Sequence, residues 1–200
     1  MSTTTAEVGL RERKKAATRE ALHQAAVRLA IAHGVDKVTI EAVADAAGVS
    51  RRTFSNYFAS KEQALLHGDH QRMRALVDAV HARPVNESPW VALTNAAELL
   101  YEGLRDLDPQ TVAQGRLVRG QPALAAQQVN IFAALERELA AEVAGRLDQP
   151  DPAGVRARLT AAAFLAALRV SLNVWLDQPP GTRLWDVVRD ALAQTGRGFA

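Results

Sequence analysis

The chain has 200 residues, of which 48% are hydrophobic and 23% charged, and its formal net charge is +2. This length allows one medium domain or a small domain joined to a larger one, with a soluble globular rather than a disordered composition. The absence of cysteine excludes disulfides, thiolate-bound zinc, iron–sulfur clusters and a cysteine nucleophile. The longest apolar run, residues 161–168, is far shorter than the ~20 residues of a membrane span, so we expect a cytoplasmic protein outside the membrane.

Alanine occupies 39 positions and isoleucine only three, which predicts an all-α fold because alanine favours helices and β-branched residues favour strands. The predicted order is a flexible tail (1–9), a small helical head (10–60), a connecting helix (61–83) and a larger helical body (84–200). Apolar periodicity and Gly or Pro stops predict helices over residues 10–33, 39–48, 51–58, 61–82, 90–107, 110–119, 122–147, 154–177 and 183–194.

The positive charge is concentrated near the N-terminus. Residues 1–75 carry 12 Lys and Arg against 8 Asp and Glu, whereas residues 76–200 carry 12 against 14. The basic segment 11–19 precedes an apolar-periodic stretch, as expected for contacts to nucleic-acid phosphates, although a solvated helix face would have the same composition.

The most informative segment is residues 39–58, TIEAVADAAGVSRRTFSNYF, which has the pattern of two short helices joined by a sharp turn. Thr39 and Ser50 are suited to cap the two helices, Gly48 permits the positive φ of the turn, and Val49 fills the gap between them. This is a helix-turn-helix pattern, and it presents its second helix outward.

On that second helix the aromatic residues Phe54 and Phe58 share one side, and the polar residues point away from it. Arg, Asn and Thr can recognise guanine, adenine and the thymine methyl in the major groove. The residues predicted to read bases are Arg51, Arg52, Thr53, Ser55 and Asn56, with a backbone contact as the alternative for Arg51. The residues predicted to contact phosphates are Lys15, Thr39, Tyr57 and Lys61.

The run GVSRRTFSNYF, followed by Ser60-Lys61-Glu62, resembles the DNA-binding domain of TetR-type (tetracycline-repressor-like) transcriptional regulators over roughly residues 15–66. The family often has Leu at the position of Phe54, so its base preference does not transfer. The resemblance implies a homodimer in which the connecting helix links the DNA-binding head to an effector-binding body. That helix, residues 61–82, is the expected lever of the allosteric switch.

The resemblance also implies that the last two long helices form the dimer interface, and an apolar stripe with small neighbours fits such packing. The residues predicted at the interface are Phe164, Leu168, Trp175, Leu184 and Val188. The alternative is that this stripe is buried inside the monomer.

Arg169 and Asn173 lie opposite that stripe and need polar partners. They face an effector pocket, pair internally with Glu98 or Glu102, or are exposed. In regulators of the family that this chain resembles, the body helices surround the ligand cavity. With that resemblance, the predicted pocket residues are Trp90, Tyr101, Arg116, Arg119, Asn130, Phe132, Arg169 and Asn173. The body also resembles, more loosely, regulators of the mycofactocin system, which implies an acyl-CoA-like effector.

We therefore expect a homodimeric repressor that binds double-stranded DNA and is released by a small hydrophobic or acyl-CoA-like effector. A DNA-binding protein without ligand sensing is the first alternative. A helical metal enzyme is a remote one. Glu20 with His23 and Asp78 with His81 match its acidic-x-x-His pattern only superficially, because Glu20 and His23 are predicted to project outward, and His67 and His70 are predicted to be solvated on the surface. We predict no catalytic residues, no metal and no cofactor.

Overall fold

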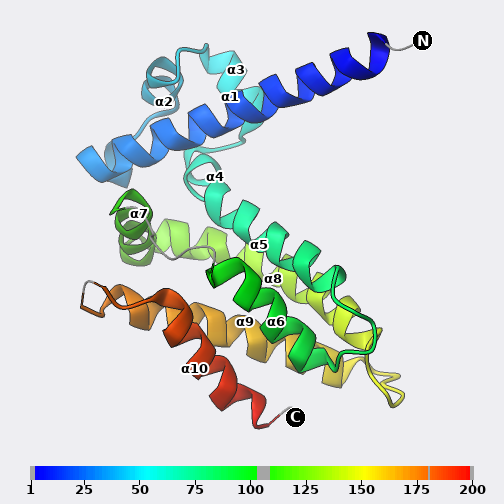
Figure 1. The fold of residues 1–200 in the computed structure, drawn as a ribbon. Helices are drawn as coiled ribbons and strands as arrows, with labels where there is room; N and C mark the ends of the chain where they lie inside the picture. The colour runs from blue at the N-terminus through cyan, green and yellow to red at the C-terminus, as the bar shows by residue number, and fades with distance from the viewer. Residues whose placement is uncertain (1–2, 103–108, 180, 199–200) are drawn as a thin grey trace. The chain divides into compact units, whose positions relative to one another are not determined.

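The computed structural model describes residues 3–102, 109–179 and 181–198, with only the backbone described for residues 3–10 and 109–111. The described residues form helices and no strand, so the predicted all-α class is confirmed (Figure 1). The α-helices are α1 (Thr3–His33), α2 (Ile40–Ala46), α3 (Arg51–Tyr57), α4 (Lys61–Leu65), α5 (His67–His81), α6 (Pro89–Glu102), α7 (Pro109–Gly120), α8 (Pro122–Ala144), α9 (Val155–Leu176) and α10 (Leu184–Gly196), and the 3₁₀ turn Val35–Lys37 follows α1.

Contacts divide the chain into two compact units. The N-terminal unit comprises residues 1–69 and 116–127, and the C-terminal unit comprises residues 70–115 and 128–200. The association of residues 116–127 with the N-terminal unit was not predicted, because sequence order alone assigns them to the body.

The first helix begins earlier than predicted. Its backbone is helical from Thr3, within the segment expected to be a flexible tail, while residues 1–2 lie outside the described residues. Extending a nucleated helix costs little, and Ala6 and Glu7 favour helix. The backbone over residues 3–9 is therefore helical, and the flexibility of this segment stays a prediction.

The connecting segment is not one continuous helix. α4 ends at Leu65, Leu66 has φ −89° and ψ 4°, and α5 begins at His67. Ala64, Leu65 and Leu66 are all buried, with at most 1% exposure. Three successive residues point in directions about 100° apart on a regular helix, so burying all three favours a break. The predicted continuous helix over residues 61–82 is therefore divided into α4 and α5 at Leu66, and its role as a lever stays a prediction.

The C-terminal unit is built around α9, which packs against α10 and α6. Its core includes Leu93 of α6, Leu139 of α8, Phe164 of α9 and Leu192 of α10. The predicted helix over 90–107 corresponds to α6 as far as Glu102, and residues 103–108 lie outside the described residues.

Candidate nucleic-acid interface

The aromatic side of α3 is internal, as predicted. Phe54 has no exposed surface and Phe58 is 4% exposed, and their ring centroids lie 5.8 Å apart. Burying two Phe side chains stabilises the unit by roughly 2–3 kcal/mol each. The short helix α3, too short to be stable alone, is therefore held by its packing.

His23 is buried and not outward-facing. The residue is 4% exposed, and its Nδ1 lies 2.8 Å from the Ala64 carbonyl oxygen of α4. The His67 ring packs edge-on against both His23 and Phe58, with centroid distances of 5.7 and 5.3 Å. The prediction that His23 projects outward is wrong, because a polar ring is accommodated in the core where a carbonyl satisfies it. His67 is half-buried and His70 is exposed, so only His70 fits the predicted surface position.

Hydroxyl side chains cap the N-termini of both α2 and α3. Thr39 Oγ1 accepts from the Ala42 N–H at 3.1 Å, and Ser50 Oγ accepts from the Thr53 N–H at 3.1 Å. Gly48 lies between them with φ +69°, which favours glycine. These observations confirm the predicted caps and the predicted turn at Gly48.

The outward side of α3 is polar. Arg52, Ser55 and Asn56 are exposed, and the described residues offer these three side chains no hydrogen-bond or ion-pair partner. Thr53 is half-buried, and its hydroxyl is hydrogen-bonded to that of Ser50 at 2.9 Å. Thr53 is therefore less available than its sequence position indicates, whereas the other three present free donors and acceptors.

Arg51 makes a contact that the sequence did not reveal. Its Nη1 lies 3.0 Å from Glu41 Oε1, at the start of α2, with the two side chains 70% and 55% exposed. The sequence shows only that residues of opposite charge, Glu41 and Arg51, occupy the first turns of two consecutive helices. The packing of α2 against α3 brings the carboxylate and the guanidinium together.

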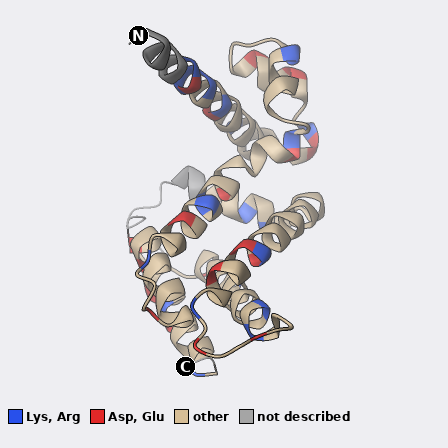
Figure 2. Cartoon of the chain, turned by 90° about the vertical axis from the view of Figure 1, so that its right-hand side faces the viewer, with Lys and Arg blue, Asp and Glu red and all other residues tan. Residues whose placement is uncertain are grey.

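The four residues predicted to contact phosphates have different surroundings. Lys15 is exposed on α1, where Figure 2 shows Lys and Arg following one another along the helix. Thr39 is used as a cap, and Tyr57 lies under the Arg19 guanidinium, 5.7 Å from the ring centroid. Lys61 donates from Nζ to the carbonyl oxygens of Val35 and Val38, both at 2.9 Å. The Lys61 ammonium thus stabilises the connection after α1, a role that the sequence did not indicate.

Comparison with known proteins agrees with this geometry. Residues 22–67 match the family model described as bacterial regulatory proteins of the tetR family, and residues 87–200 match the MftR C-terminal domain. The HTH-type transcriptional regulator TcmR of Streptomyces glaucescens is 33% identical over 173 residues, which cover 84% of this chain and 76% of TcmR. The chain belongs to the TetR family.

Two solved structures show the same fold for this TetR-family chain. The FadR repressor of Thermus thermophilus, in complex with lauroyl-CoA, has a TM-score of 0.55 and 25% identity, covering 91% of this chain and 95% of FadR. SmeT, in complex with triclosan, has a TM-score of 0.65 and 20% identity, covering 91% of each chain. The family and its relatives are transcriptional regulators, so this protein is a regulator and not an enzyme.

The residues predicted at the dimer interface of this regulator belong to the monomer's own core. Four of them are at most 5% exposed, namely Phe164, Leu168, Leu184 and Val188. Trp175 packs against the same core and donates from Nε1 to the Thr182 carbonyl at 2.7 Å. The interface prediction for this stripe is therefore wrong, and the alternative of burial inside the monomer is the one the structure supports.

The opposite side of α9 carries the exposed apolar residues. Val155, Leu159 and Val170 are 53%, 57% and 49% exposed, and Ala166 is also exposed. At 100° per residue these four positions fall within 60° of one another on the helix. Sequence analysis missed this second stripe because the stripe that contains Phe164 and Trp175 is the bulkier one.

The predicted pocket residues have different surroundings. Trp90 packs edge-on against Phe164 at 6.1 Å, Tyr101 is 9% exposed in the core, and Phe132 packs against that core. Asn130 and Arg169 are exposed, and Asn173 is half-buried on the outward side of α9. Arg116 and Arg119 belong to the N-terminal unit.

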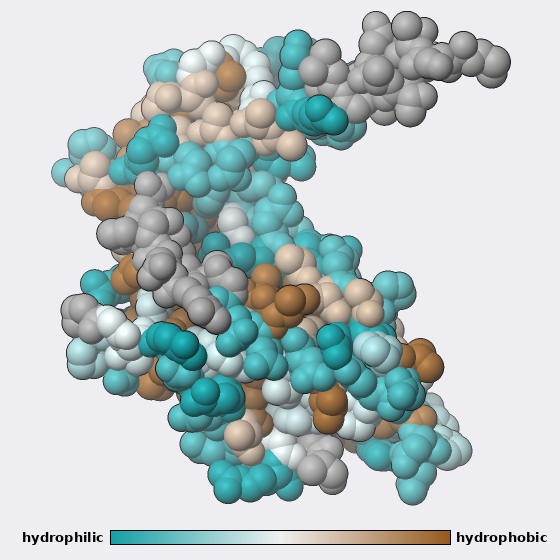
Figure 3. All heavy atoms as spheres, viewed as in Figure 1, coloured by the Kyte–Doolittle hydropathy of each residue, from teal (hydrophilic) through white to brown (hydrophobic). Residues whose placement is uncertain are grey.

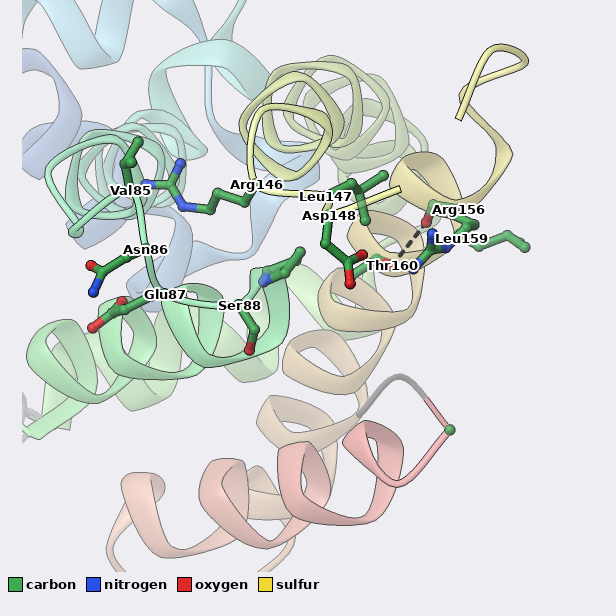
Figure 4. A pocket seen from close by; sticks show the side chains of 12 residues that line it. Val85, Asn86, Glu87, Ser88, Arg146, Leu147, Asp148, Arg156, Leu159 and Thr160 are labelled. Atoms are coloured by element: carbon green, nitrogen blue, oxygen red, sulfur yellow. Dashed lines mark hydrogen bonds between the residues drawn. The ribbon is translucent and has the colours of Figure 1, made fainter. Parts of the chain in front are cut away.

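A hollow of about 720 Å³ opens elsewhere in the C-terminal unit (Figure 4). Side chains from the α5–α6 connection, the end of α8 and the start of α9 line it, and none of the eight predicted pocket residues is among them. On its rim a hydrogen bond from Arg83 lowers the pKa of Glu87 and raises the pKa of Arg83. Arg146 donates from Nη2 to the carbonyls of Val80 and Arg83 at 2.9 and 3.1 Å, which fixes the end of α5.

The residues that superficially match a metal motif have other partners. Glu20 accepts a hydrogen bond from Gln24, and His81 Nδ1 lies 2.9 Å from Glu142 Oε1. Within the described part of the chain, no three His, Asp or Glu residues lie close enough together to hold a metal ion.

One helix among the described residues, α9, is long and apolar enough to cross a membrane by length and composition alone. Its inward side packs in the core of the C-terminal unit, as the central helix of a soluble protein does. Apolar residues also reach the molecular surface that is drawn in Figure 3, among mostly hydrophilic neighbours.

Proposed function

We propose that this TetR-family regulator is a homodimeric, ligand-responsive repressor that acts on chromosomal DNA in the cytoplasm. The observation that carries the proposal is the two-sided helix α3, which buries Phe54 and exposes Arg52, Ser55 and Asn56, three side chains that have no hydrogen-bond or ion-pair partner among the described residues. A rigid helix with free donors and acceptors is what major-groove recognition requires.

In this proposal Arg52, Ser55 and Asn56 read base edges, and Lys15 with Tyr57 contacts phosphates. Arg51 and Thr53 are further base-reading candidates whose side chains already have intramolecular partners. Binding is tested by selecting duplexes from a random pool and titrating salt against the selected and a mixed sequence. A sequence-reading dimer keeps a large affinity ratio as salt rises, whereas a constitutive, architectural binder holds both duplexes alike.

The exposed apolar stripe of α9, defined by Val155, Leu159, Ala166 and Val170, is the proposed centre of the dimer interface. Exposed stripes of this kind mark protein contacts, and the small Ala166 permits close approach of two helices. Charged residues of the neighbouring α10 suit the rim, where Arg183 and Arg189 both pair with Asp186. Because paired symmetric subunits place two recognition helices about 34–36 Å apart, such a dimer addresses two half-sites.

A charge placed in this stripe tests the interface. Val170→Asp is expected to give a monomer by light scattering and to weaken binding to the selected duplex about 100-fold, because two linked contacts become one. The matched control is Val129→Asp on α8, since Val129 is 65% exposed and lies outside the stripe. A dimeric Val170→Asp protein, or a monomeric control, would place the interface elsewhere.

A hydrophobic or acyl-CoA-like effector is supported by the MftR C-terminal domain match and by the lauroyl-CoA complex of FadR from Thermus thermophilus. An effector weakens DNA binding only if it prefers the DNA-incompetent conformation. Lauroyl-CoA is therefore expected to bind in calorimetry and to release the protein from the selected duplex. Release by neutral triclosan with no heat from lauroyl-CoA would reject the acyl-CoA class, and release by neither would favour a constitutive repressor.

A further inference from the structure

The ion pair between Glu41 and Arg51 lies beside the proposed DNA-reading face. Glu41 is in the first turn of α2, Arg51 is the first residue of α3, and their side chains meet at 3.0 Å. Because both side chains are more than half exposed, solvent screens the pair and it contributes little to folding. The pair is therefore of more interest for its position beside the proposed DNA-reading face than for its contribution to stability.

Arg51 and Arg52 are adjacent but have different environments. The first turn of a helix carries a partial positive charge at its N-terminus. Two guanidinium groups in that turn add to this charge, and the positive potential attracts anions. Glu41 neutralises Arg51, whereas the described residues offer Arg52 no acidic partner. A carboxylate and a phosphate oxygen are alternative acceptors for the same guanidinium.

We propose that Glu41 limits sequence-independent DNA affinity by competing with backbone phosphates for Arg51. The inference rests on the proposed function, since it requires α3 to approach DNA. Glu41 is a positioning residue that holds the Arg51 guanidinium across the α2–α3 turn and adds a negative charge next to it. The binding of α3 to DNA then depends more on Arg52 and Asn56 than on Arg51. The side chains of Arg52 and Asn56 are exposed and have no hydrogen-bond or ion-pair partner among the described residues.

The competing interpretation is an ordinary surface ion pair with no effect on DNA binding. The two interpretations differ in the salt dependence of binding to a duplex of mixed sequence. Each additional phosphate contact steepens the slope of log affinity against log salt by about 0.9. A purely structural role leaves that slope unchanged.

The experiment measures fluorescence anisotropy of a labelled mixed-sequence duplex across a range of NaCl concentrations, with the full-length protein. Glu41→Gln is expected to bind several-fold more tightly at low salt, with a slope steeper by about 0.9 per subunit. Asp45→Asn is the matched control, because it removes the same charge from the exposed surface of α2 but at a residue with no described basic partner.

The double variant Glu41→Gln, Arg51→Met shows whether the effect acts through Arg51. The gain in affinity is expected to disappear in that background, and thermal melts check that every variant is folded. An unchanged or weaker affinity for Glu41→Gln, an equal gain for Asp45→Asn, or a gain that persists without Arg51 would each overturn the proposal. Failure of the unmodified protein to bind any duplex would instead overturn the proposed function.

Discussion

Helices α3 and α9 both bury one side and expose the other, but their exposed sides differ in chemistry. The exposed side of α3 carries Arg52 and Asn56, whereas that of α9 carries Leu159 and Val170. A polar exposed side on a short, well-anchored helix is suited to nucleic acid, and an apolar one requires a protein partner to cover it. The two units of the chain thus expose surfaces of different chemistry.

The comparison depends first on Phe164 being part of the core and not of the interface. Phe164→Ala is expected to lower the free energy of unfolding by about 3–5 kcal/mol, because it leaves a cavity at a site with no exposed surface. Urea denaturation measures this loss. The paired control is Leu159→Ala, on the exposed side of α9. An equal loss for Leu159→Ala at a concentration where the protein is monomeric would contradict the assignment of the two sides.

For α3, we expect substitutions on the exposed side to weaken DNA binding and substitutions on the buried side to lower the stability of the fold. Arg52→Ala is expected to cost about 1–3 kcal/mol of binding to the selected duplex, the value of one bidentate base contact, with an unchanged melting temperature. Phe54→Ala serves as the reversed control, because it removes a core side chain of the same helix. If Arg52→Ala weakens selected and mixed-sequence duplexes equally, Arg52 contacts phosphates and not bases.

Lys61 and Lys15 are two basic residues of the N-terminal unit that we expect to have different roles. Lys61→Met is expected to destabilise the protein by about 1–3 kcal/mol, because two carbonyl oxygens lose their ammonium donor. Lys15→Met should instead leave stability unchanged and reduce the salt slope of DNA binding by about one. Thermal melts and salt titrations of both variants distinguish the two roles, and a reversal of this pattern would restore Lys61 as a phosphate contact.

The smallest expected effect is at the start of α9. Asp151 accepts from the N–H groups of Val155 and Ala157 at 3.1 and 3.0 Å, and these bonds, that of Ala157 foremost, lower its pKa. A carboxylate with a lowered pKa stabilises the folded state above the unfolded pKa of about 3.9, and this contribution is lost as pH falls through the folded pKa. Asp151→Asn should therefore reduce the melting temperature at pH 7 and match the unsubstituted protein in strong acid. Asp148→Asn is the control in the same loop. If Asp151→Asn still melts at a lower temperature than the unsubstituted protein in strong acid, the Asp151 carboxylate does not stabilise the start of α9.

The two helices also show how far sequence patterns reach. On α3 the aromatic residues mark the inner side and polar residues mark the outer one, so periodicity assigned Phe54 and Asn56 correctly. On α9 both sides are apolar, so periodicity found the helix but chose the bulkier stripe for the interface. The bulkier residues, Phe164 above all, contribute more when buried, which places them in the core.

The amino-acid sequence by itself determined the helical class, the helix-turn-helix with its Thr39 and Ser50 caps, and the family, because these depend on local spacing and local hydrogen bonds. Only the tertiary structure decided that His23 is internal, that Lys61 donates to main-chain carbonyls and that Glu41 pairs with Arg51. Each of these contacts joins residues of different structural elements. The partners are 41 positions apart for His23 and Ala64, 26 and 23 for Lys61 with Val35 and Val38, and 10 for Glu41 and Arg51. The periodicity of a single helix cannot show which neighbouring element its side chains will meet.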